Sequence, residues 1–338
     1  MEEWRSFLFV IWNLKFDNSP PLVGHGGCSS MVERRSVEPI VGGSTPLSHP
    51  MNNTNLKLAI QKEGRLTDET LVFLKKSGLE FESYNQRLYS TCRNFPLEII
   101  YVRVSDIPDY VSSGSVDLGI IGQNILYEER PKVKKLLNLR FGFCSLIVAI
   151  PKESNIKNLY DLRGQKIATS YPNSTANFFK KNSVSIKIVN ITGSVEITPT
   201  LGVSQAVVDL TSSGSTLELN DLKVLTKIYD SEAVLITNDQ TQKSTKKKLL
   251  GKLLTRFKGV LSAKDYKYVM MNAPKDIIPR LKKITPGLKS PTLSPLAKNG
   301  WYSVQTVIKE DIFWETIEKL KKLGASGILV LPIEKIIT

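Results

Sequence analysis

Short apolar runs alternate with amphipathic segments along most of this chain, a pattern that predicts an α/β fold with parallel strands. The spacing of polar residues predicts helices after most of these runs, one of which we expect Thr67 to cap and Gly78 to end. The strands predicted before residue 240 are 56–60, 98–104, 116–121, 145–150, 166–170, 186–191, 224–229 and 233–236, together with a short strand that begins at Val207 and ends at Asp209.

The series of strands and helices begins twice, which indicates two lobes. We expect the first lobe over 51–150, completed by strands that return at about 224–240, and the second lobe over 151–223. Because the chain crosses between them, the two lobes should form a cleft that closes on a ligand by hinge motion.

After an amphipathic helix at 243–261 the order of elements changes. Residues 262–338 contain, in order, a strand, a helix, two strands, a helix and a strand. This βαββαβ order is that of a ferredoxin-like domain. We therefore expect a third domain, large enough to fold around its own core.

Residues 1–50 show neither helical nor strand periodicity and are interrupted by glycine and proline clusters. We expect this segment to be disordered, or to be upstream sequence with translation beginning at Met51. The apolar stretch Phe7–Trp12 follows two acidic residues and lacks a cleavage site, so it does not resemble a secretory signal. Since no apolar run approaches the roughly 18 to 20 residues that span a bilayer, we expect a cytoplasmic protein.

Composition narrows the possible chemistry. Both histidines, His25 and His49, precede Met51, so the expected domains have no histidine base, histidine metal ligand or Ser-His-Asp triad. The three cysteines are far apart, which favours idle thiols over a disulfide framework or a zinc site. A formal net charge of +14 indicates anionic partners, and we rank a nucleotide-like ligand above nucleic acid.

The segment Val207–Leu217 has the composition of an anion-binding loop. An apolar run brings Asp209 to the end of a strand, and small hydroxyl residues and a glycine follow. Gly214 can adopt backbone angles that turn neighbouring amides toward one phosphate, and Asp209 would suit the hydroxyls of an adjoining sugar. We therefore expect a phosphoribosyl pocket, with an ordinary Ser- and Gly-rich turn as the alternative. The loop residues expected to bind substrate are Thr211, Ser212, Ser213, Gly214, Ser215 and Thr216.

Other candidates lie on or after three further strands of the predicted sheets. Open α/β sheets bind ligands at the carboxyl ends of their strands, where cations, glycines and a tyrosine that can stack on a base are suited to a nucleotide. Polar loop residues and a half-buried ring are the structural alternative. The candidates are Lys62, Gly64 and Arg65 after the first strand, Gly119 in the third, and Ser170 with Tyr171 after the fifth.

The anion loop belongs to a longer pattern that resembles the long form of ATP phosphoribosyltransferase, a family that catalyses the first step of histidine biosynthesis. Family segments also occur at 61–66, 116–122, 168–172 and 324–326, so the resemblance extends from about residue 56 to the C-terminus. The family signature is met at ten positions, which are Glu196, Gly202, Ser204, Val207, Asp209, Leu210, Ser213, Gly214, Thr216 and Leu217.

The resemblance implies two periplasmic-binding-protein-like (type II) α/β lobes that form a catalytic cleft, plus a C-terminal ferredoxin-like βαββαβ regulatory domain. It implies transfer of the phosphoribosyl group of phosphoribosyl pyrophosphate to N1 of ATP, with release of pyrophosphate. It further implies a Mg²⁺ requirement, inhibition by histidine, and homodimers that assemble into hexamers, with no nucleic-acid or membrane partner.

Roles for individual residues also follow from matching the family segments. The residues implied to be catalytic are Lys62, Arg65, Glu196 and Asp209, and Asp117 joins Gly119 in the substrate-binding group. The residues implied to bind the regulatory histidine are Asn272, Ala273, Thr292 and Ser294.

Two other classes of protein remain open from the sequence. A non-catalytic bilobal protein that binds an anionic small molecule would share the fold, although it would normally carry an export signal. A basic nucleic-acid-binding protein would explain the net charge, and salt-sensitive retention on DNA without phosphoribosyl transfer would favour it.

Overall fold

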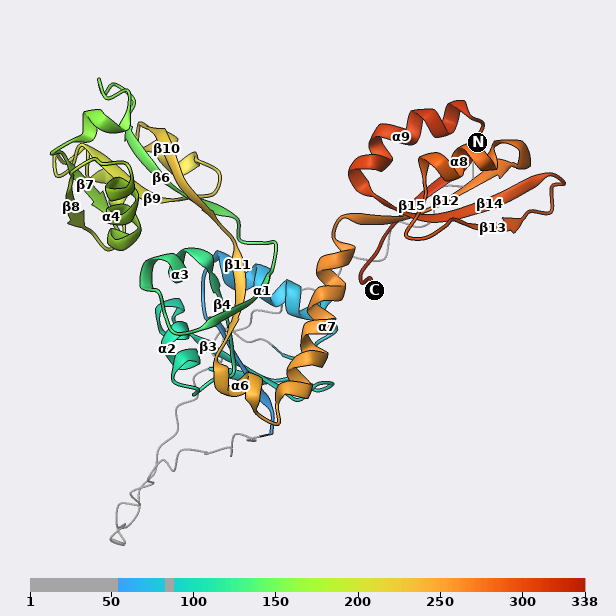
Figure 1. Cartoon of the computed structure of the whole chain (residues 1–338), viewed down its shortest axis with the longest axis horizontal. Coiled ribbons are helices and arrows are strands. Elements are labelled where there is room, and N and C mark those ends of the chain that lie inside the picture. The colour runs from blue at the N-terminus through green and yellow to red at the C-terminus, as the bar shows by residue number, and fades with distance from the viewer. Residues whose placement is uncertain (1–53, 83–87, 338) are drawn as a thin grey trace, which may run out of the picture. The chain divides into compact units, whose positions relative to one another are not determined.

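A computed structural model describes residues 54–82 and 88–337 of the chain. The expectations for residues 1–50 and for a start at Met51 fall outside these residues. Within the described part the strands form three separate sheets of six, five and four strands (Figure 1). The first two sheets belong to α/β lobes and the third to a C-terminal domain.

The sheet of lobe 1 has the order β2-β3-β1-β4-β11-β5. Its strands are β1 (Leu56–Gln61), β2 (Tyr89–Thr91), β3 (Leu97–Val102), β4 (Leu118–Gly122), β5 (Lys134–Asn138) and β11 (Ala233–Thr237). Strand β1 pairs in parallel with β3 and β4, whereas β11 runs antiparallel to β4. Helices α1 (Arg65–Lys76) and α7 (Lys247–Ala263) pack on one face, and α2 (Ile107–Ser112) and α3 (Gln123–Glu129) on the other (Figure 1).

Alternation along β1 explains the two faces of this sheet. Leu58 and Ile60 point into the core beneath α1 and α7, while Ala59 between them lies against the α2 side. The sheet is therefore apolar on both faces, as expected for parallel strands that are covered by helices on both sides.

The sheet of lobe 2 has the order β10-β6-β9-β7-β8. Its strands are β6 (Cys144–Pro151), β7 (Lys166–Thr169), β8 (Lys187–Asn190), β9 (Ala206–Thr211) and β10 (Leu222–Ser231). Its helices are the 3₁₀ turns η2 (Leu159–Leu162) and η3 (Val195–Ile197) and the α-helices α4 (Pro172–Lys181) and α5 (Ser215–Leu219). In lobe 1 the edge strand β2 and the returning strand β11 run opposite to the other strands of their sheet, and in lobe 2 β6 does so. The expected pair of type II lobes is confirmed.

The sheet topology corrects the predicted lobe boundaries. Strand β6 pairs with β9 and β10, so it belongs to lobe 2 rather than to 51–150. Strand β10 also lies in lobe 2, and only β11 returns to lobe 1. An apolar run identifies a strand but not its neighbours, because the pairing depends on residues far away in the sequence.

The start of α1 also differs from the prediction. The helix begins at Arg65, with Gly64 as the residue before it at a φ of 122°. Thr67 lies inside the first turn, where its hydroxyl donates to the carbonyl of Gln61 at 3.0 Å. Gly64 can adopt this backbone conformation because it has no Cβ, so the tight turn after β1 places a cation at the helix start.

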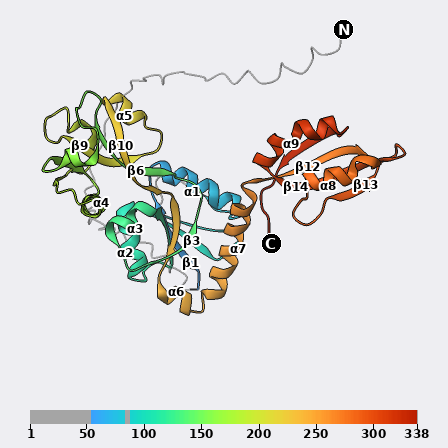
Figure 2. The same cartoon turned by 45° about the horizontal axis from the view of Figure 1, so that its top comes forward.

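The C-terminal domain confirms the predicted ferredoxin-like order, with its sheet arranged β13-β14-β12-β15. Its elements are β12 (Tyr266–Pro274), η4 (Lys275–Ile277), α8 (Ile278–Ile284), β13 (Thr292–Pro295), β14 (Trp301–Lys309), α9 (Glu310–Lys322) and β15 (Ser326–Pro332). Helices α8 and α9 cover the same face of the sheet (Figure 2), and their side chains share one core with Met271 and Val304.

The remaining helices are short, namely η1 (Val104–Asp106) and α6 (Asp239–Lys243). Among the helices that the structure describes, none carries an apolar stretch of the length that a bilayer span requires.

Candidate functional site

The carboxyl ends of three neighbouring strands in lobe 2 bring most of the predicted site residues together. Strand β7 lies between β8 and β9 and is parallel to both, with Thr169 opposite Asn190 and Val208. The segments at these strand ends are Ser170–Tyr171, the turn with Glu196, and the end of β9 at Asp209 with the loop that follows Thr211. This is the edge where open α/β sheets bind their ligands.

The anion loop after β9 is open but only partly free to bind. Gly214 has a φ of 80°, and a Cβ added to it would meet no atom within 4 Å. Its own amide already donates to Oγ1 of Thr211 at 3.0 Å, which corrects the expectation that this amide faces the phosphate. No acceptor among the described residues takes the amides of Ser213, Ser215 or Thr216, so these three remain as donors for an anion.

Arg65 reaches this loop from the other lobe. Its Nη1 donates to Oγ of Ser212 at 3.1 Å, although Arg65 opens α1 in lobe 1. Lys62 is also exposed and makes only a loose ion pair with Glu63, at 3.9 Å between Nζ and Oε1. Two cations of the β1–α1 turn are therefore available to a ligand held by the loop. A side chain at Gly64 would disturb this turn, because an added Cβ would lie 2.7 Å from Nε2 of Gln61.

Asp209 and Glu196 are the two acids of the site. Partial burial raises the pKa of Asp209, and the negative charge of Glu196 raises it further, so the two carboxylates lie close enough to sense each other. The amide of Leu210, which donates to Oδ1 of Asp209 at 2.8 Å, acts in the opposite direction. A pair of carboxylates beside an anion loop is suited to sugar hydroxyls or to a shared divalent cation.

Ser170 and Tyr171 lie at the end of β7, as predicted. The hydroxyl of Ser170 donates to the carbonyl of Ile191 at 2.6 Å, so only its lone pairs remain for a ligand. Tyr171 packs against the core of lobe 2. Burial raises its pKa, and the nearby Asp209 and Tyr229 raise it further, so the phenol stays neutral and can donate a hydrogen bond.

The structure removes Asp117 from the predicted substrate-binding group. This residue precedes β4, at the opposite edge of the sheet from the strand ends that carry the site. Its carboxylate accepts from the amide of Lys57 at 2.8 Å and from the hydroxyl of Thr241 at 3.0 Å, and it pairs with Lys246 at 2.8 Å. Asp117 therefore joins α7 to the sheet, and its carboxylate is fully engaged.

Gly119 is also removed from that group. It lies inside β4, where an added Cβ would come within 2.5 Å of Cγ2 of Ile107. The glycine allows α2 to pack closely on the sheet, so its small size serves the core and not a ligand. Close helix packing and close ligand approach give the same sequence signal, which is why the motif suggested a binding role.

Sequence reasoning missed Glu128. The carboxylate of this α3 residue accepts hydrogen bonds from the backbone amides of Asn173 and Ser174 at 2.7 and 2.9 Å. Glu128 therefore caps α4 from the other lobe. The side-chain amide of Asn173 also donates to the carbonyl of Glu128 at 3.1 Å. The first turn of α4 has no acidic residue and no side-chain cap of its own, and that lack was the one available signal for a distant partner.

In the C-terminal domain the predicted histidine-binding residues lie only partly together. Asn272 pairs with Ser303, and Ser303 pairs with Ser294, so these three form one row across β12, β14 and β13. Thr292 lies two positions from Ser294, on the same face. The methyl group of Ala273 instead belongs to the buried core, so only its backbone can contact a ligand in that row. Sequence reasoning missed Ser303, which the register places at the centre.

Fold and site together define a two-lobed, periplasmic-binding-protein-like α/β protein with a hydroxyl-rich loop after β9 and a separate ferredoxin-like domain. The family model described as ATP phosphoribosyltransferase matches residues 103–259. A second model, described as HisG, C-terminal domain, matches residues 263–335.

Similar proteins carry the same description over nearly their whole length. An ATP phosphoribosyltransferase of Cytophaga hutchinsonii is 44% identical over 285 residues, which cover 84% of this chain and 99% of that protein. One of Bacteroides thetaiotaomicron is 46% identical over 282 residues, or 83% of this chain and 99% of that protein. The solved ATP phosphoribosyl transferase (HisG:HisZ) complex from Thermotoga maritima aligns with a TM-score of 0.51 at 28% identity, over 60% of this chain and 98% of that one.

The chain belongs to the ATP phosphoribosyltransferase family, in its long form with the C-terminal domain. It is a transferase that moves the phosphoribosyl group of phosphoribosyl pyrophosphate to N1 of ATP and releases pyrophosphate, the first step of histidine biosynthesis.

Proposed function

We propose that the loop from Asp209 to Thr216 binds the 5-phosphate and ribose of phosphoribosyl pyrophosphate, while Lys62 and Arg65 bind its pyrophosphate. The observation that carries this assignment is the hydrogen bond of 3.1 Å between Arg65 and Ser212, since it brings a lobe 1 cation to the anion loop. A phosphorylated ligand between these groups would meet amide donors on one side and cations on the other.

The reaction is consistent with a site that has no histidine. Adenine N1 attacks as a neutral nitrogen and has no proton to lose, so no general base is required. The difficulty is that the ribose becomes positively charged while pyrophosphate leaves, and this is overcome by positioning and by fixed charges. In this proposal Asp209 and Glu196 face the ribose, and Ser170 and Tyr171 hold the purine.

We assign Mg²⁺ to the substrate rather than to a protein cage. The described residues contain no cluster of three or more His, Cys, Asp or Glu side chains that could hold a metal ion. Mg²⁺ is commonly bound by one or two carboxylates together with substrate phosphates, a role that Asp209 and Glu196 could fill. When bound, the ion neutralises charge on the pyrophosphate.

Histidine is the proposed feedback inhibitor, and the row of Asn272, Ser303 and Ser294 is its proposed site, with Thr292 beside it. These side chains supply amide and hydroxyl groups that can bind an amino group, a carboxylate or an imidazole. The backbone of Ala273 completes the site in this proposal.

The protein is further proposed to assemble into dimers and hexamers. Support comes from β15, an edge strand of the C-terminal sheet on which Leu329, Val330 and Leu331 are all exposed. An exposed apolar edge strand is a common surface for pairing with another chain.

Turnover tests the central assignment. Purified protein mixed with ATP, phosphoribosyl pyrophosphate and Mg²⁺ should form the N1 adduct and pyrophosphate in equal amounts, and Arg65→Ala should slow this reaction. Binding of phosphoribosyl pyrophosphate without any turnover would instead favour the non-catalytic binding protein.

A further inference from the structure

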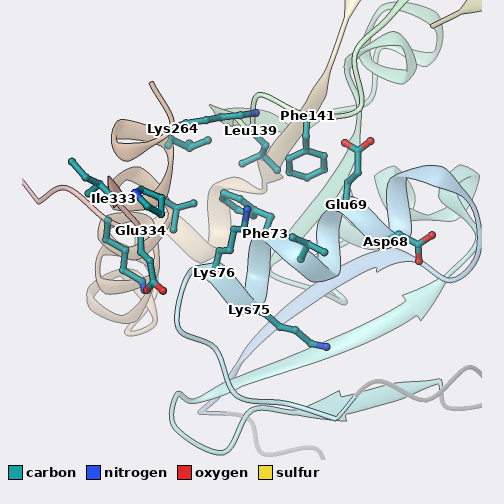
Figure 3. A pocket seen from close by; sticks show the side chains of 15 residues that line it. Asp68, Glu69, Phe73, Lys75, Lys76, Leu139, Phe141, Lys264, Ile333 and Glu334 are labelled. Carbon is teal, nitrogen blue, oxygen red and sulfur yellow. The ribbon is translucent and has the colours of Figure 1, made fainter. Parts of the chain in front are cut away.

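A cavity of about 710 Å³ lies apart from every residue assigned to the substrate site. It is bounded by α1 from Asp68 to Lys76, by Leu139 and Phe141 before β6, by the end of α7, and by residues 332–335 at the end of β15 and beyond (Figure 3). We call it the α1–α7 cavity. Its size falls within the usual range for small-molecule sites.

The floor of the α1–α7 cavity is apolar and partly aromatic. Phe73, Leu139 and Phe141 gather at its centre (Figure 3), and the rings of Phe73 and Phe141 lie 5.6 Å apart. The ring of Phe73 also packs against that of Phe257 on α7, with 4.9 Å between the ring centres, and this contact holds Phe73 in place. A rigid aromatic floor favours a ligand with a flat apolar body.

The charged side chains around the cavity differ in whether they have a partner within the protein. Of the three acids that line the cavity, Glu69 accepts a hydrogen bond from the amide of Gly142 at 2.7 Å, and Glu334 pairs with Lys335 at 3.1 Å. The third, Asp68, forms no salt bridge within the described residues. No carboxylate of the described residues forms a salt bridge with Lys76 or Lys264.

Lys264 is held in surroundings that disfavour its charge. Burial lowers its pKa, and the cation Arg140 lowers it further, with a smaller effect from Lys76. The carboxylates of Asp265 and Glu69 act in the opposite direction but do not cancel the shift. Its ammonium donates to the carbonyl of Arg140, which leaves other protons of the group available. Because Lys76 and Lys264 form no salt bridge with a carboxylate of the described residues, their ammonium groups can bind an anion at this rim.

One wall of the cavity is part of the connection between the lobes. Arg140, next to Phe141, donates its amide to Glu232 at 2.8 Å, and Glu232 lies between β10 and β11 where the chain returns to lobe 1. The guanidinium of Arg140 also binds both carboxylate oxygens of Asp265 at 2.8 and 2.7 Å, just before the C-terminal domain. A ligand in the cavity would thus touch the segment Arg140–Phe141. This segment contacts Glu232, where the chain returns to lobe 1, and Asp265, which precedes the C-terminal domain.

We propose that the α1–α7 cavity binds a small aromatic carboxylate, whose ring lies on Phe73 and Phe141 and whose carboxylate lies between Lys76 and Lys264. The occupant acts as an effector that lowers kcat, because it restrains the Arg140–Phe141 segment that must move when the lobes open and close. This site is separate from both the substrate site and the proposed histidine site.

Calorimetric titration of the full chain with 2-naphthoate tests the site, with the uncharged 2-naphthylmethanol as the comparison ligand. The carboxylate should bind at least about tenfold more tightly, because it gains charge-assisted contacts. Lys76→Met on α1 should remove this preference, whereas Lys252→Met, at an exposed lysine of α7 that does not line the cavity, should keep it. Equal binding of the two ligands would overturn the assignment of an anion.

A second pair of variants locates the ligand. Val72 lines the cavity and is 51% exposed, and Val224 in lobe 2 is 52% exposed, so Val72→Glu and Val224→Glu introduce the same charge at matched positions. Only Val72→Glu should weaken 2-naphthoate binding, by at least about tenfold, and it should keep the wild-type kcat in the absence of ligand. Equal affinity in both variants, or displacement of 2-naphthoate by substrates, would place the ligand elsewhere and refute the site.

Rate measurements test the effector role separately. Saturating 2-naphthoate should lower kcat of the wild type and leave that of Val72→Glu unchanged. An unchanged or higher kcat in the wild type would overturn the effector role. Since the binding titration needs no turnover, its result stands apart from the proposed roles of the catalytic residues.

Discussion

Arg65 and Ser212 are 147 positions apart in the sequence and lie in different lobes, yet Nη1 of the arginine donates to the serine hydroxyl at 3.1 Å. This contact joins the start of α1 to the anion loop after β9. Because both groups are exposed, the bond by itself adds little stability. Its importance is that a phosphate bound to the loop would replace a neutral hydroxyl as the partner of Arg65.

Replacing Arg65 by alanine should lower kcat/KM for phosphoribosyl pyrophosphate by about 10- to 100-fold. The estimate corresponds to the loss of one charge-assisted contact, worth roughly 1.5–3 kcal/mol. Steady-state kinetics with each substrate varied provide the measurement. Arg93→Ala is the matched control, since this exposed arginine pairs with Glu82 on the surface of lobe 1. Unchanged kcat and unchanged Michaelis constants in Arg65→Ala would contradict the assignment.

Asp209→Asn should reduce activity while raising the melting temperature at neutral pH. Burial and Glu196 raise the folded-state pKa of Asp209 above its unfolded value, so folding takes up protons between the two values. The ionised residue therefore costs stability at neutral pH, and this cost disappears as the pH falls toward the ordinary aspartate pKa of about 3.9. The benefit of the substitution should shrink over the same range, as followed by thermal unfolding.

Asp161→Asn is the control, because it should change the melting temperature in the opposite direction. The amides of Lys157 and Asn158 lower the pKa of Asp161, so its ionised form stabilises the fold at neutral pH. Its replacement should lower the melting temperature there, and the loss should vanish as the pH falls below the normal aspartate range. If both variants shifted in the same direction, the proposed electrostatics of Asp209 would be wrong.

Glu128→Gln should raise the Michaelis constant for ATP by about tenfold with a smaller effect on kcat. Glu128 now accepts hydrogen bonds from two backbone N–H groups. The side-chain NH₂ group of the glutamine would face one of these N–H groups and could not accept from it. Losing that hydrogen bond costs on the order of 1 kcal/mol or more. The contact lies directly after Ser170 and Tyr171, the residues proposed to hold the purine. Glu129→Gln is the matched control on the same helix, and equal kinetics in both variants would remove Glu128 from substrate positioning.

Histidine at millimolar concentration should inhibit the enzyme, and Asn272→Ala should weaken that inhibition at least about tenfold while leaving the uninhibited rate unchanged. The residue lies in the C-terminal domain, in the row with Ser303 and Ser294. Initial rates over a histidine titration provide the measurement. Activity that millimolar histidine does not affect would rule out the regulatory proposal.

Leu331→Glu should reduce the oligomer mass, because it places a carboxylate on the exposed edge strand β15. Light scattering after size-exclusion chromatography measures the mass. Leu288→Glu is the control, since Leu288 is a similarly exposed leucine of the same domain outside this strand. An oligomer that tolerates both substitutions would show that β15 is not the interface.

Much of this protein is determined locally in the sequence. Apolar runs and helix signals define the two α/β series and the βαββαβ domain, because strands and helices depend on side-chain periodicity over short distances. The turn after β9, with Gly214 at its centre, was likewise predictable, since glycine and hydroxyl residues specify such turns through neighbouring backbone atoms. Its binding of an anion stays a prediction.

The tertiary structure alone decided which residues meet across long distances. In the folded protein β6 and β10 pair within lobe 2, Asp117 forms a salt bridge with Lys246, and Glu128 lies at the start of α4. Each of these depends on strand pairing or side-chain contacts between segments that are not adjacent in the chain. A motif records which groups are present, but the packing of distant segments determines whether a carboxylate or a glycine remains available to a ligand.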